Sequence, residues 1–332
     1  MVFSTEVNIP EFPWKIDYSK GVMFIGSCFS DNIGQKLANL KFPVDINPFG
    51  VLYNPLSIAN SLKFLINKQE FFESDLFQDH ELWNSFNHHS SFSDVDQEMA
   101  LNKINNRITF SHQTLKNADF LTITFGTAWA YKLKNSNQIV ANCHKIPASH
   151  FTRTRLNTHE IVDVYQHLLE KLWAFNPKLK ILFTVSPIRH WKDGAIENQV
   201  SKATLILAID ELRHTFANQL CAYFPAYELV MDELRDYRFY AADMLHLSDV
   251  AIDYIFERFQ SILISKESIQ TSKRIDKIRK SMNHKPFNTN TPEYTRFVET
   301  NIQEIKRLSE SLPTISFNDE LEFFERKLLK ST

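Results

Sequence analysis

Short apolar runs alternate with amphipathic stretches between residues 20 and 265. Four runs have the length and the β-branched and aromatic content of buried strands: VMFI (22–25), FLTITF (120–125), ILFTV (181–185) and AYELV (226–230). Strands that are apolar throughout and separated by helices are typical of a parallel sheet covered on both faces. The pattern therefore predicts an α/β fold, a three-layer α/β/α sandwich with a mainly parallel sheet.

The intervening stretches predict the helices of this sandwich. Ile33, Leu37 and Leu40 recur at helical spacing after the first run, with Ser30 or Asp31 as the expected N-cap. Further helices are expected at 55–66, around 161–172, and at 200–220 and 250–264. Two polar stretches, about 67–118 and 130–158, are expected as insertions in a domain spanning 1–265. Helical periodicity after residue 265 predicts a helical C-terminal appendage over 266–332.

Composition excludes several classes of protein. The 332 residues carry a formal net charge of -2, so the chain as a whole offers no electrostatic basis for binding nucleic acid. No apolar run reaches the roughly 20 residues that span a bilayer. The N-terminus has neither a basic nor an apolar signal region, and three cysteines make no disulfide framework. We therefore expect a cytoplasmic protein without a membrane span; nothing in the sequence indicates an oligomeric state.

The strongest chemical signal is the turn after the first predicted strand. Gly26 is followed by two nucleophilic side chains, Ser27 and Cys28, where a helix begins. In an open α/β sheet, ligands bind beyond the carboxyl ends of the strands. Backbone N–H groups at a helix N-terminus can hold an oxyanion, and the helix dipole favours a thiolate. The alternative is that Cys28 is an ordinary buried small hydrophobe.

A second signal follows the last predicted strand. Asp243 precedes His246 by three residues, so its carboxylate can curl back to hold the imidazole and leave the other ring nitrogen as a general base. The alternative is an N-cap aspartate beside a surface histidine. A nucleophile after the first strand and an acid–base pair after the last could meet at one edge of the sheet.

These motifs resemble the GSCFA family, which is similar to the SGNH (GDSL) hydrolases. The signature here reads Gly26-Ser27-Cys28-Phe29-Ser30, and the likeness continues through NPFGVLYNP (47–55), TFGTAWAY (124–131), ANCHKIP (141–147) and the segment ending in DMLHLS (243–248). The resemblance implies an SGNH hydrolase/flavodoxin-like fold. It implies Cys28 by register, or alternatively Ser27, as nucleophile, with Asp243 and His246 as its partners.

The resemblance also implies an oxyanion hole. Gly50 and Gly126 match the glycines of the second and third SGNH blocks, but Ala128 stands where that third block has an asparagine donor. Another donor would have to replace it. We expect the following polar and aromatic residues to bind substrate: Asn47, Asn54, Trp129, Asn142, His144, Lys145, Arg189, His190 and Arg238. The alternative is a salt-bridge network that braces long loops.

No histidine or cysteine spacing matches a metal site, and no Gly-rich phosphate loop is present, so neither metal nor cofactor is expected. The leading hypothesis is an acyl hydrolase, an esterase or thioesterase, acting on a polar small-molecule or glycan-linked acyl substrate. An acyltransferase using an acyl-CoA-type donor is the second hypothesis. A non-catalytic ligand-binding protein is the third, because the asparagine donor is missing.

Overall fold

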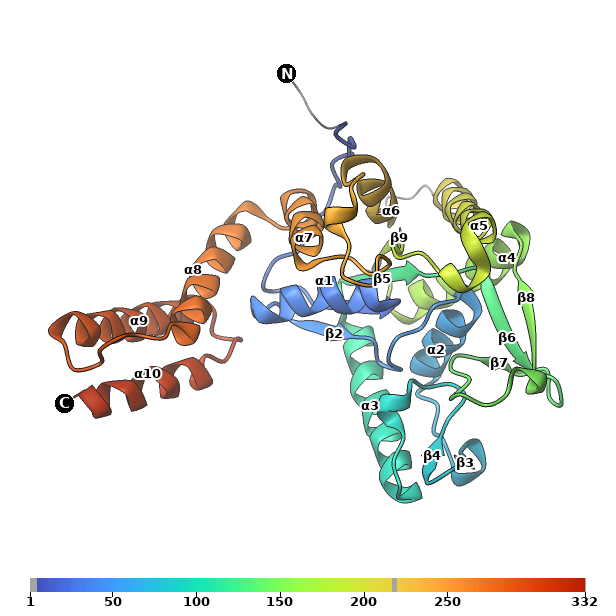
Figure 1. Cartoon of the computed structure of the whole chain (residues 1–332), viewed down its shortest axis with the longest axis horizontal. Coiled ribbons are helices and arrows are strands. Elements are labelled where there is room, and N and C mark those ends of the chain that lie inside the picture. The colour runs from blue at the N-terminus through green and yellow to red at the C-terminus, as the bar shows by residue number, and fades with distance from the viewer. Residues whose placement is uncertain (1–4, 217–219, 332) are drawn as a thin grey trace.

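The computed structural model describes residues 5–216 and 220–331, and a five-stranded parallel sheet lies at its centre (Figure 1). The strands follow the order β10 (Cys221–Tyr223), β9 (Lys180–Val185), β5 (Phe120–Phe125), β1 (Val22–Gly26) and β2 (Val44–Ile46). β1 pairs with β5 from Val22 opposite Phe120 to Gly26 opposite Thr124. Every residue of these two strands is buried, as expected for a sheet covered on both faces.

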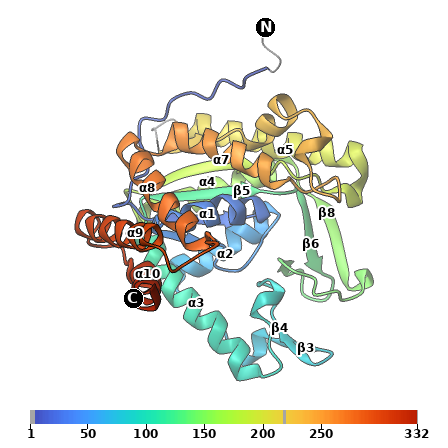
Figure 2. The same ribbon diagram turned by 60° about the vertical axis from the view of Figure 1, so that its left-hand side comes forward.

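Helices cover both faces of the sheet, which confirms the predicted three-layer α/β/α arrangement (Figures 1 and 2). Successive residues of β1 serve opposite cores, because side chains alternate along a strand: Met23 packs in one core and Phe24 in the other. The first core is covered by α2 (Pro55–Asn67), α3 (Gln97–Asn117), α4 (Thr158–Phe175) and α5 (Gly194–Thr215). The second is covered by α1 (Cys28–Asn39) and α7 (Asp249–Leu263).

The strand order reverses between β1 and β5. From β1 the chain passes through α1 to β2 on one side, and it returns through α2 and α3 to β5 on the other side. In folds of this kind the ligand site lies at such a reversal, beyond the carboxyl ends of the two strands. The Gly26 turn and the segment beginning at Gly126 leave the sheet at this point.

Helices α1 and α7 both begin at the carboxyl edge of the sheet. α7 ends near the start of β1, because the N–H of Ile16 donates to the carbonyl of Leu263 at 2.7 Å. It therefore runs opposite to the strands, as α1 does, and the two helices lie side by side (Figure 2). An ion pair between Lys36 and Asp253 joins them. The N-terminal arm (residues 5–17) is held against the end of α7 by two hydrogen bonds. One is the bond from Ile16 to Leu263, and the other runs from the Lys15 ammonium to the carbonyl of Ile262.

The two expected insertions are more ordered than predicted. In the first, β3 (Phe77–Asp79) and β4 (Leu82–Asn84) form a hairpin, but α3 is a 21-residue helix whose apolar stripe completes the first core. The prediction of an insertion over all of 67–118 is therefore wrong for α3. In the second, β6 (Trp129–Leu133), β7 (Ile139–Val140) and β8 (Phe151–Arg155) form a separate antiparallel sheet.

Three helices follow α7, in agreement with the helical periodicity of this region: α8 (Lys266–Asn283), α9 (Pro292–Ser311) and α10 (Asn318–Ser331). They extend away from the central sheet (Figure 1). Several basic residues of this region lie beside carboxylates; Arg274 bonds Glu304, and Arg279 and Lys280 share Asp276. Such pairs are typical of a solvated helix face rather than of a patch for an anionic partner.

Some element predictions are wrong at the boundaries. α1 is capped by Ser27 and not by Ser30 or Asp31. The run 226–230 is not a strand; it forms the short helix α6 (Ala226–Glu228) and the π-helical turn η5 (Leu229–Glu233), while the strand precedes it as β10. α5 begins at Gly194 rather than at 200, and 217–219 of its predicted end lie outside the described residues. The remaining short turns are η1 (Glu73–Asp75), η2 (Ser90–Phe92), η3 (Ala148–His150), η4 (Trp191–Asp193) and η6 (Tyr237–Phe239).

Candidate active site

Gly26 allows the tight turn between β1 and α1. Its φ is +138°, and a Cβ at this position would lie 2.2 Å from the carbonyl oxygen of Thr124 on β5. Only glycine fits there without moving backbone. α1 begins two residues later at Cys28, and the Ser30 hydroxyl donates to the Thr124 hydroxyl at 2.7 Å, which fixes the first turn of α1 against β5.

The two candidate nucleophiles lie in different environments. Ser27 is 1% exposed, and its Oγ accepts a hydrogen bond from the N–H of Phe29 at 3.3 Å, so it caps α1. Cys28 occupies the first helical position and is only partly buried. Cys28 therefore keeps some solvent exposure, whereas the Ser27 hydroxyl is buried and committed to the helix cap.

Electrostatics at Cys28 differ from the sequence-based expectation. Burial, followed by the nearby Asp31 carboxylate, raises the pKa of the Cys28 thiol above its usual value. The N–H groups of Cys28 and Phe29 and the ammonium of Lys202 act in the opposite direction but do not outweigh them. The helix N-terminus lowers this pKa as expected, but the net shift is upward because partial burial and a carboxylate on the same helical turn dominate.

Asp243 and His246 form the predicted pair. The Nδ1 of His246 lies 2.6 Å from the Oδ2 of Asp243, and the Oδ1 accepts hydrogen bonds from the N–H groups of Leu245 and His246 at 3.0 and 2.9 Å. These bonds lower the pKa of Asp243 to about 2. The side chains are 48% and 58% exposed, on a turn in which Met244 adopts a positive φ of 59°.

The pair and Cys28 share the same edge of the sheet without touching. His246 lies three residues before α7, and Cys28 begins α1, so both lie where these helices start. β10 and β1 are not neighbours, however, since β9 and β5 separate them. Within the described residues, no hydrogen bond joins Cys28 to His246. The prediction that neighbouring strand ends bring them together is therefore wrong; α7 carries the pair to this edge.

The two glycines predicted for the oxyanion hole donate elsewhere in this conformation. The N–H of Gly50 bonds the carbonyl of Asn47 at 2.8 Å, and the N–H of Gly126 bonds the carbonyl of Tyr53 at 2.8 Å. A Cβ on Gly50, whose φ is +75°, would lie 2.2 Å from the Cβ of His89. Both glycines therefore permit close packing around the turn, and their N–H groups are not directed at a substrate.

Asn47 and Asn54 are also engaged within the protein. Asn47 accepts from the N–H of Gly26 at 2.8 Å and donates to the carboxylate of Asp31 at 2.6 Å. Asn54 caps α2 through the N–H of Ser57 at 2.9 Å. With side-chain groups already bonded and residues 6% and 4% exposed, both asparagines stabilise loops. Neither supplies the missing oxyanion donor in this conformation.

Lys202 lies behind this site, and sequence reasoning placed it only among the charges near the strand ends, without a role of its own. It is 1% exposed on α5, and its ammonium donates to the carbonyls of Gly126 and Ser186, each at 2.6 Å. Burial lowers the pKa of Lys202 to about 7, and the charge of Cys28 opposes that shift. A lysine on an apolar helix face resembles many surface lysines in sequence, so only the structure reveals its burial.

A cleft of about 750 Å³ collects many of the residues predicted to bind substrate. Its lining includes Asn54, Trp129, Asn142, His144, Lys145 and His190. One face of Trp129 packs against the guanidinium of Arg153, whose Cζ lies 4.1 Å from the ring centroid. The His144 Nε2 is tied to the carbonyl of Ser85 at 2.8 Å. Strands β6 to β8 and the β3–β4 hairpin therefore build one wall of a cleft beside the β1–β5 reversal.

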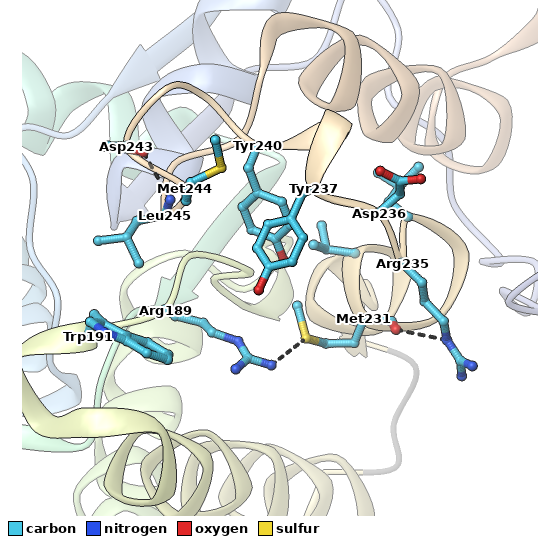
Figure 3. Close-up of a pocket in the computed structure, with 12 residues that line it drawn as sticks. Arg189, Trp191, Met231, Arg235, Asp236, Tyr237, Tyr240, Asp243, Met244 and Leu245 are labelled. Carbon is cyan, nitrogen blue, oxygen red and sulfur yellow. Dashed lines mark hydrogen bonds between the residues drawn. The ribbon is translucent and has the colours of Figure 1, made fainter.

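A second cleft, of about 500 Å³, lies next to Asp243 (Figure 3). We call it the Arg189 cleft; it is lined by Arg189, Trp191, Val230, Met231, Leu234, Arg235, Asp236, Tyr237, Tyr240 and 243–245. Arg238 lies outside both clefts, with its side chain 74% exposed beside Asp236. The other predicted arginine, Arg189, therefore remains the substrate-binding candidate at this end of the site.

Among the described residues, no group of three or more histidine, cysteine or acidic side chains is placed to hold a metal ion. None of the described helices is both long enough and apolar enough to cross a bilayer.

Residues 21–259 match the sequence model of the GSCFA family. Residues 275–330 match a second one, described as the GSCFA domain protein, C-terminal domain. The first match spans β1, the Gly26 turn and the Asp243–His246 pair, and the second covers most of α8 to α10.

The chain also matches solved structures, among them two esterases. An acetyl xylan esterase from the rumen bacterium Butyrivibrio proteoclasticus matches with 12% identity and a TM-score of 0.31, over 66% of this chain and 57% of the esterase. A carbohydrate esterase family 3 protein from Talaromyces cellulolyticus matches with 10% identity and a TM-score of 0.35, over 76% of this chain and 98% of that one. The chain thus spans 57% of the length of the xylan esterase. No curated protein matches the sequence.

Proposed function

The chain belongs to the GSCFA family, and from the residues at its β1–β5 reversal we propose that it is an acyl hydrolase, an esterase or thioesterase, with Cys28 as nucleophile. The observation that carries this proposal is the position of Cys28. It is the partly exposed nucleophile at the start of α1, whereas Ser27 beside it is buried as the helix cap. A half-buried thiol at the carboxyl edge, where an α/β sheet places its ligands, is suited to attack a bound carbonyl.

In the proposed reaction, His246 acts as the general base. Its Nδ1 is held by Asp243, so the Nε2 is free to accept the thiol proton. The sulfur of Cys28 then bonds the substrate carbonyl carbon. As the C–O bond of the ester breaks, the imidazolium returns the proton to the leaving alcohol. Water next attacks the thioester and gives its proton to His246, which returns it to the departing sulfur as the carboxylic acid leaves.

The raised pKa of Cys28 fits this order of events. A thiol that is protonated at rest needs a base during attack, and the exposed turn carrying His246 would move toward α1 to supply it. First-turn amides of a helix lack intrahelical acceptors, so the N–H of Cys28 is our candidate oxyanion donor. The buried charge of Lys202 adds positive potential behind it.

We propose that the 750 Å³ cleft holds the larger part of a polar substrate. The exposed ring of Tyr53, the indole of Trp129 and the imidazole of His190 line it together with Asn142 and Lys145. Flat rings bordered by amide and ammonium groups suit a sugar or another polyhydroxylated group carrying an ester. In this proposal a small-molecule or glycan-linked acyl substrate would lie in the cleft with its ester group directed toward Cys28.

The experiment is to incubate the full chain with 4-nitrophenyl acetate and to combine steady-state kinetics with mass spectrometry of the intact protein. We expect an acetyl adduct on Cys28, no turnover in Cys28→Ala, and a loss of at least about 100-fold in His246→Ala. Ser27→Ala is the matched control and should still turn over the ester. Unchanged hydrolysis in Cys28→Ala, or acetyl on Ser27, would overturn the assignment.

An acyltransferase would show the same adduct with a different acceptor. It is distinguished by adding acyl-CoA and following the melting temperature, which rises for a donor that binds the folded state. If the natural protein forms no adduct and does not turn over the ester above background, the third hypothesis, ligand binding without chemistry, is favoured instead.

A further inference from the structure

The Arg189 cleft lies between two segments that follow β9 and β10, next to the acid–base pair. Trp191 and Arg189 come from the connection between β9 and α5, and Met231, Tyr237 and Tyr240 come from the segment before Asp243 (Figure 3). Val230, Leu234 and Leu245 add apolar surface. The result is a mostly apolar cleft, with aromatic rings on opposite sides and one guanidinium directed into it.

Among residues 5–216 and 220–331, Arg189 has no acidic partner. In the part of the chain that the structure describes, its one polar contact is with the sulfur of Met231, 3.5 Å from a guanidinium nitrogen. A thioether is a weak acceptor, whereas a guanidinium carries five N–H donors. The side chain is half-buried, so water replaces the missing partner only in part. The guanidinium is therefore left with donors that an incoming group can use.

Each of the four neighbouring arginines lies beside a carboxylate that neutralises its charge. Arg153 bonds Asp193 and Arg155 bonds Glu197 on the far side of η4, and Arg235 and Arg238 each lie beside an aspartate. The cleft's own carboxylates do not reach Arg189. Both oxygens of Asp243 are taken by the His246 turn, and Asp236 accepts from the N–H of Arg238 at 2.9 Å.

We propose that the Arg189 cleft binds a carboxylate carried by the substrate, so that the protein favours esters bearing a free acid group attached to an apolar or aromatic body. A planar guanidinium fork matches the two oxygens of a carboxylate and gives a charge-assisted pair. Trp191 and Tyr237 offer flat surfaces for the attached body. As a statement about substrate, this rests on the proposed hydrolase function, since Asp243 at the edge of the cleft places the bound group beside the reacting ester.

The test uses benzoate and benzamide, which share size and shape and differ in charge. Isothermal titration calorimetry at low salt measures both on the full chain, on Arg189→Gln and on Arg235→Gln. We expect benzoate to bind the natural protein at least about tenfold more tightly than benzamide. In Arg189→Gln this preference should vanish while benzamide binding remains, which shows that the cleft is intact. Arg235 lies at the exposed rim of the same cleft and pairs with Asp232, so Arg235→Gln should keep the preference for benzoate over benzamide.

Equal binding of the two probes to the natural protein would overturn the proposal, as would an equal loss in Arg235→Gln. Inorganic phosphate serves as a third probe: displacement of benzoate by phosphate at a similar concentration would show that the site recognises anions in general and would overturn the carboxylate assignment. Binding to Cys28→Ala separates the two proposals. If Cys28→Ala still prefers benzoate and still hydrolyses the ester, Cys28 is not the nucleophile, but the assignment of the carboxylate site to the Arg189 cleft is unaffected.

Discussion

The ammonium of Lys202 lies 2.6 Å from the carbonyl oxygen of Gly126, and the same group bonds Ser186 across the gap between the ends of β5 and β9. One buried cation thus joins two of the loops that surround the site. Two close carbonyls offset part of the desolvation of the Lys202 ammonium. Among the described residues, no carboxylate accepts a hydrogen bond from it. This explains why its pKa falls to about 7.

The first prediction concerns stability against pH. The pKa of Lys202 is about 7 in the folded chain and near its ordinary 10.5 in the unfolded chain, so the unfolded chain holds the extra proton between these values. The contribution of Lys202 therefore increases the free energy of unfolding as pH rises from 7, by about 2 kcal/mol up to pH 9. Urea unfolding at pH 7 and pH 9 measures this contribution. The free energy of unfolding should rise by about 2 kcal/mol more between these pH values in the natural protein than in Lys202→Met. Lys178→Met, at an exposed lysine, should leave the slope unchanged.

The second prediction compares two glycines at the ends of β1. Gly26→Ala should destabilise the fold by at least about 3 kcal/mol, because the added Cβ meets the Thr124 carbonyl at 2.2 Å with φ at +138°. Gly21→Ala is the control, since its Cβ would make an ordinary contact at 3.5 Å with Ala118. Urea midpoints measure both variants. Similar midpoints for the two would refute the close approach of β1 and β5.

The third prediction concerns thiol reactivity. Because burial and Asp31 raise the pKa of Cys28, iodoacetamide should modify it slowly at pH 7 and about tenfold faster for each pH unit toward 9. Asp31→Asn should speed the reaction several-fold at pH 8 by removing the carboxylate. Peptide mass spectrometry provides Cys221 as internal control, which burial shifts to a pKa of about 12 and which should react more slowly. Fast, pH-independent labelling of Cys28 would indicate a thiolate at rest.

The fourth prediction concerns the acid–base pair. Asp243→Asn keeps an oxygen that can accept from the N–H groups of Leu245 and His246, but it presents an amide to the Nδ1 of His246. The imidazole would then adopt the wrong tautomer, and kcat for the acetyl ester should fall by about 100- to 10,000-fold. Asp249→Asn, just beyond the turn, is the matched carboxylate control. An unaffected kcat in Asp243→Asn would remove the pair from the mechanism.

The parts of the fold that sequence predicts well are those with one dominant signal. β1, β5 and β9 are apolar runs of five or six residues, a length that fits a buried strand better than any other buried element. The run 226–230 misleads because a short apolar stretch serves a buried turn as readily as a strand. The pattern does not predict α3 because most of its residues are polar. Its buried residues Ala100, Ile104 and Ile108 nevertheless recur every four positions, as in a helix with one buried face.

At the site, sequence identifies residue types and structure decides what each one does. The motif indicates both Ser27 and Cys28, and only burial and the cap bond separate them. The direction of the Cys28 pKa shift depends on burial first, and then on Asp31 against Lys202 and the first amides of α1, none of which can be read from residue spacing. Lys202 lies in neither the motif of the nucleophile nor that of the acid–base pair, and its role follows from where α5 places it.

The pairing of Ile16 with residues around 264 has a consequence for how the chain is made. The N-terminal arm can find its partner only after the ribosome has produced nearly 250 further residues, since Ile16 bridges Ile264. Until then Phe12 and Trp14, which are buried in the finished protein, have no α7 to pack beside. Such a long sequence separation delays closure of the domain, and we expect the newly synthesised chain to pass through a state with these rings uncovered.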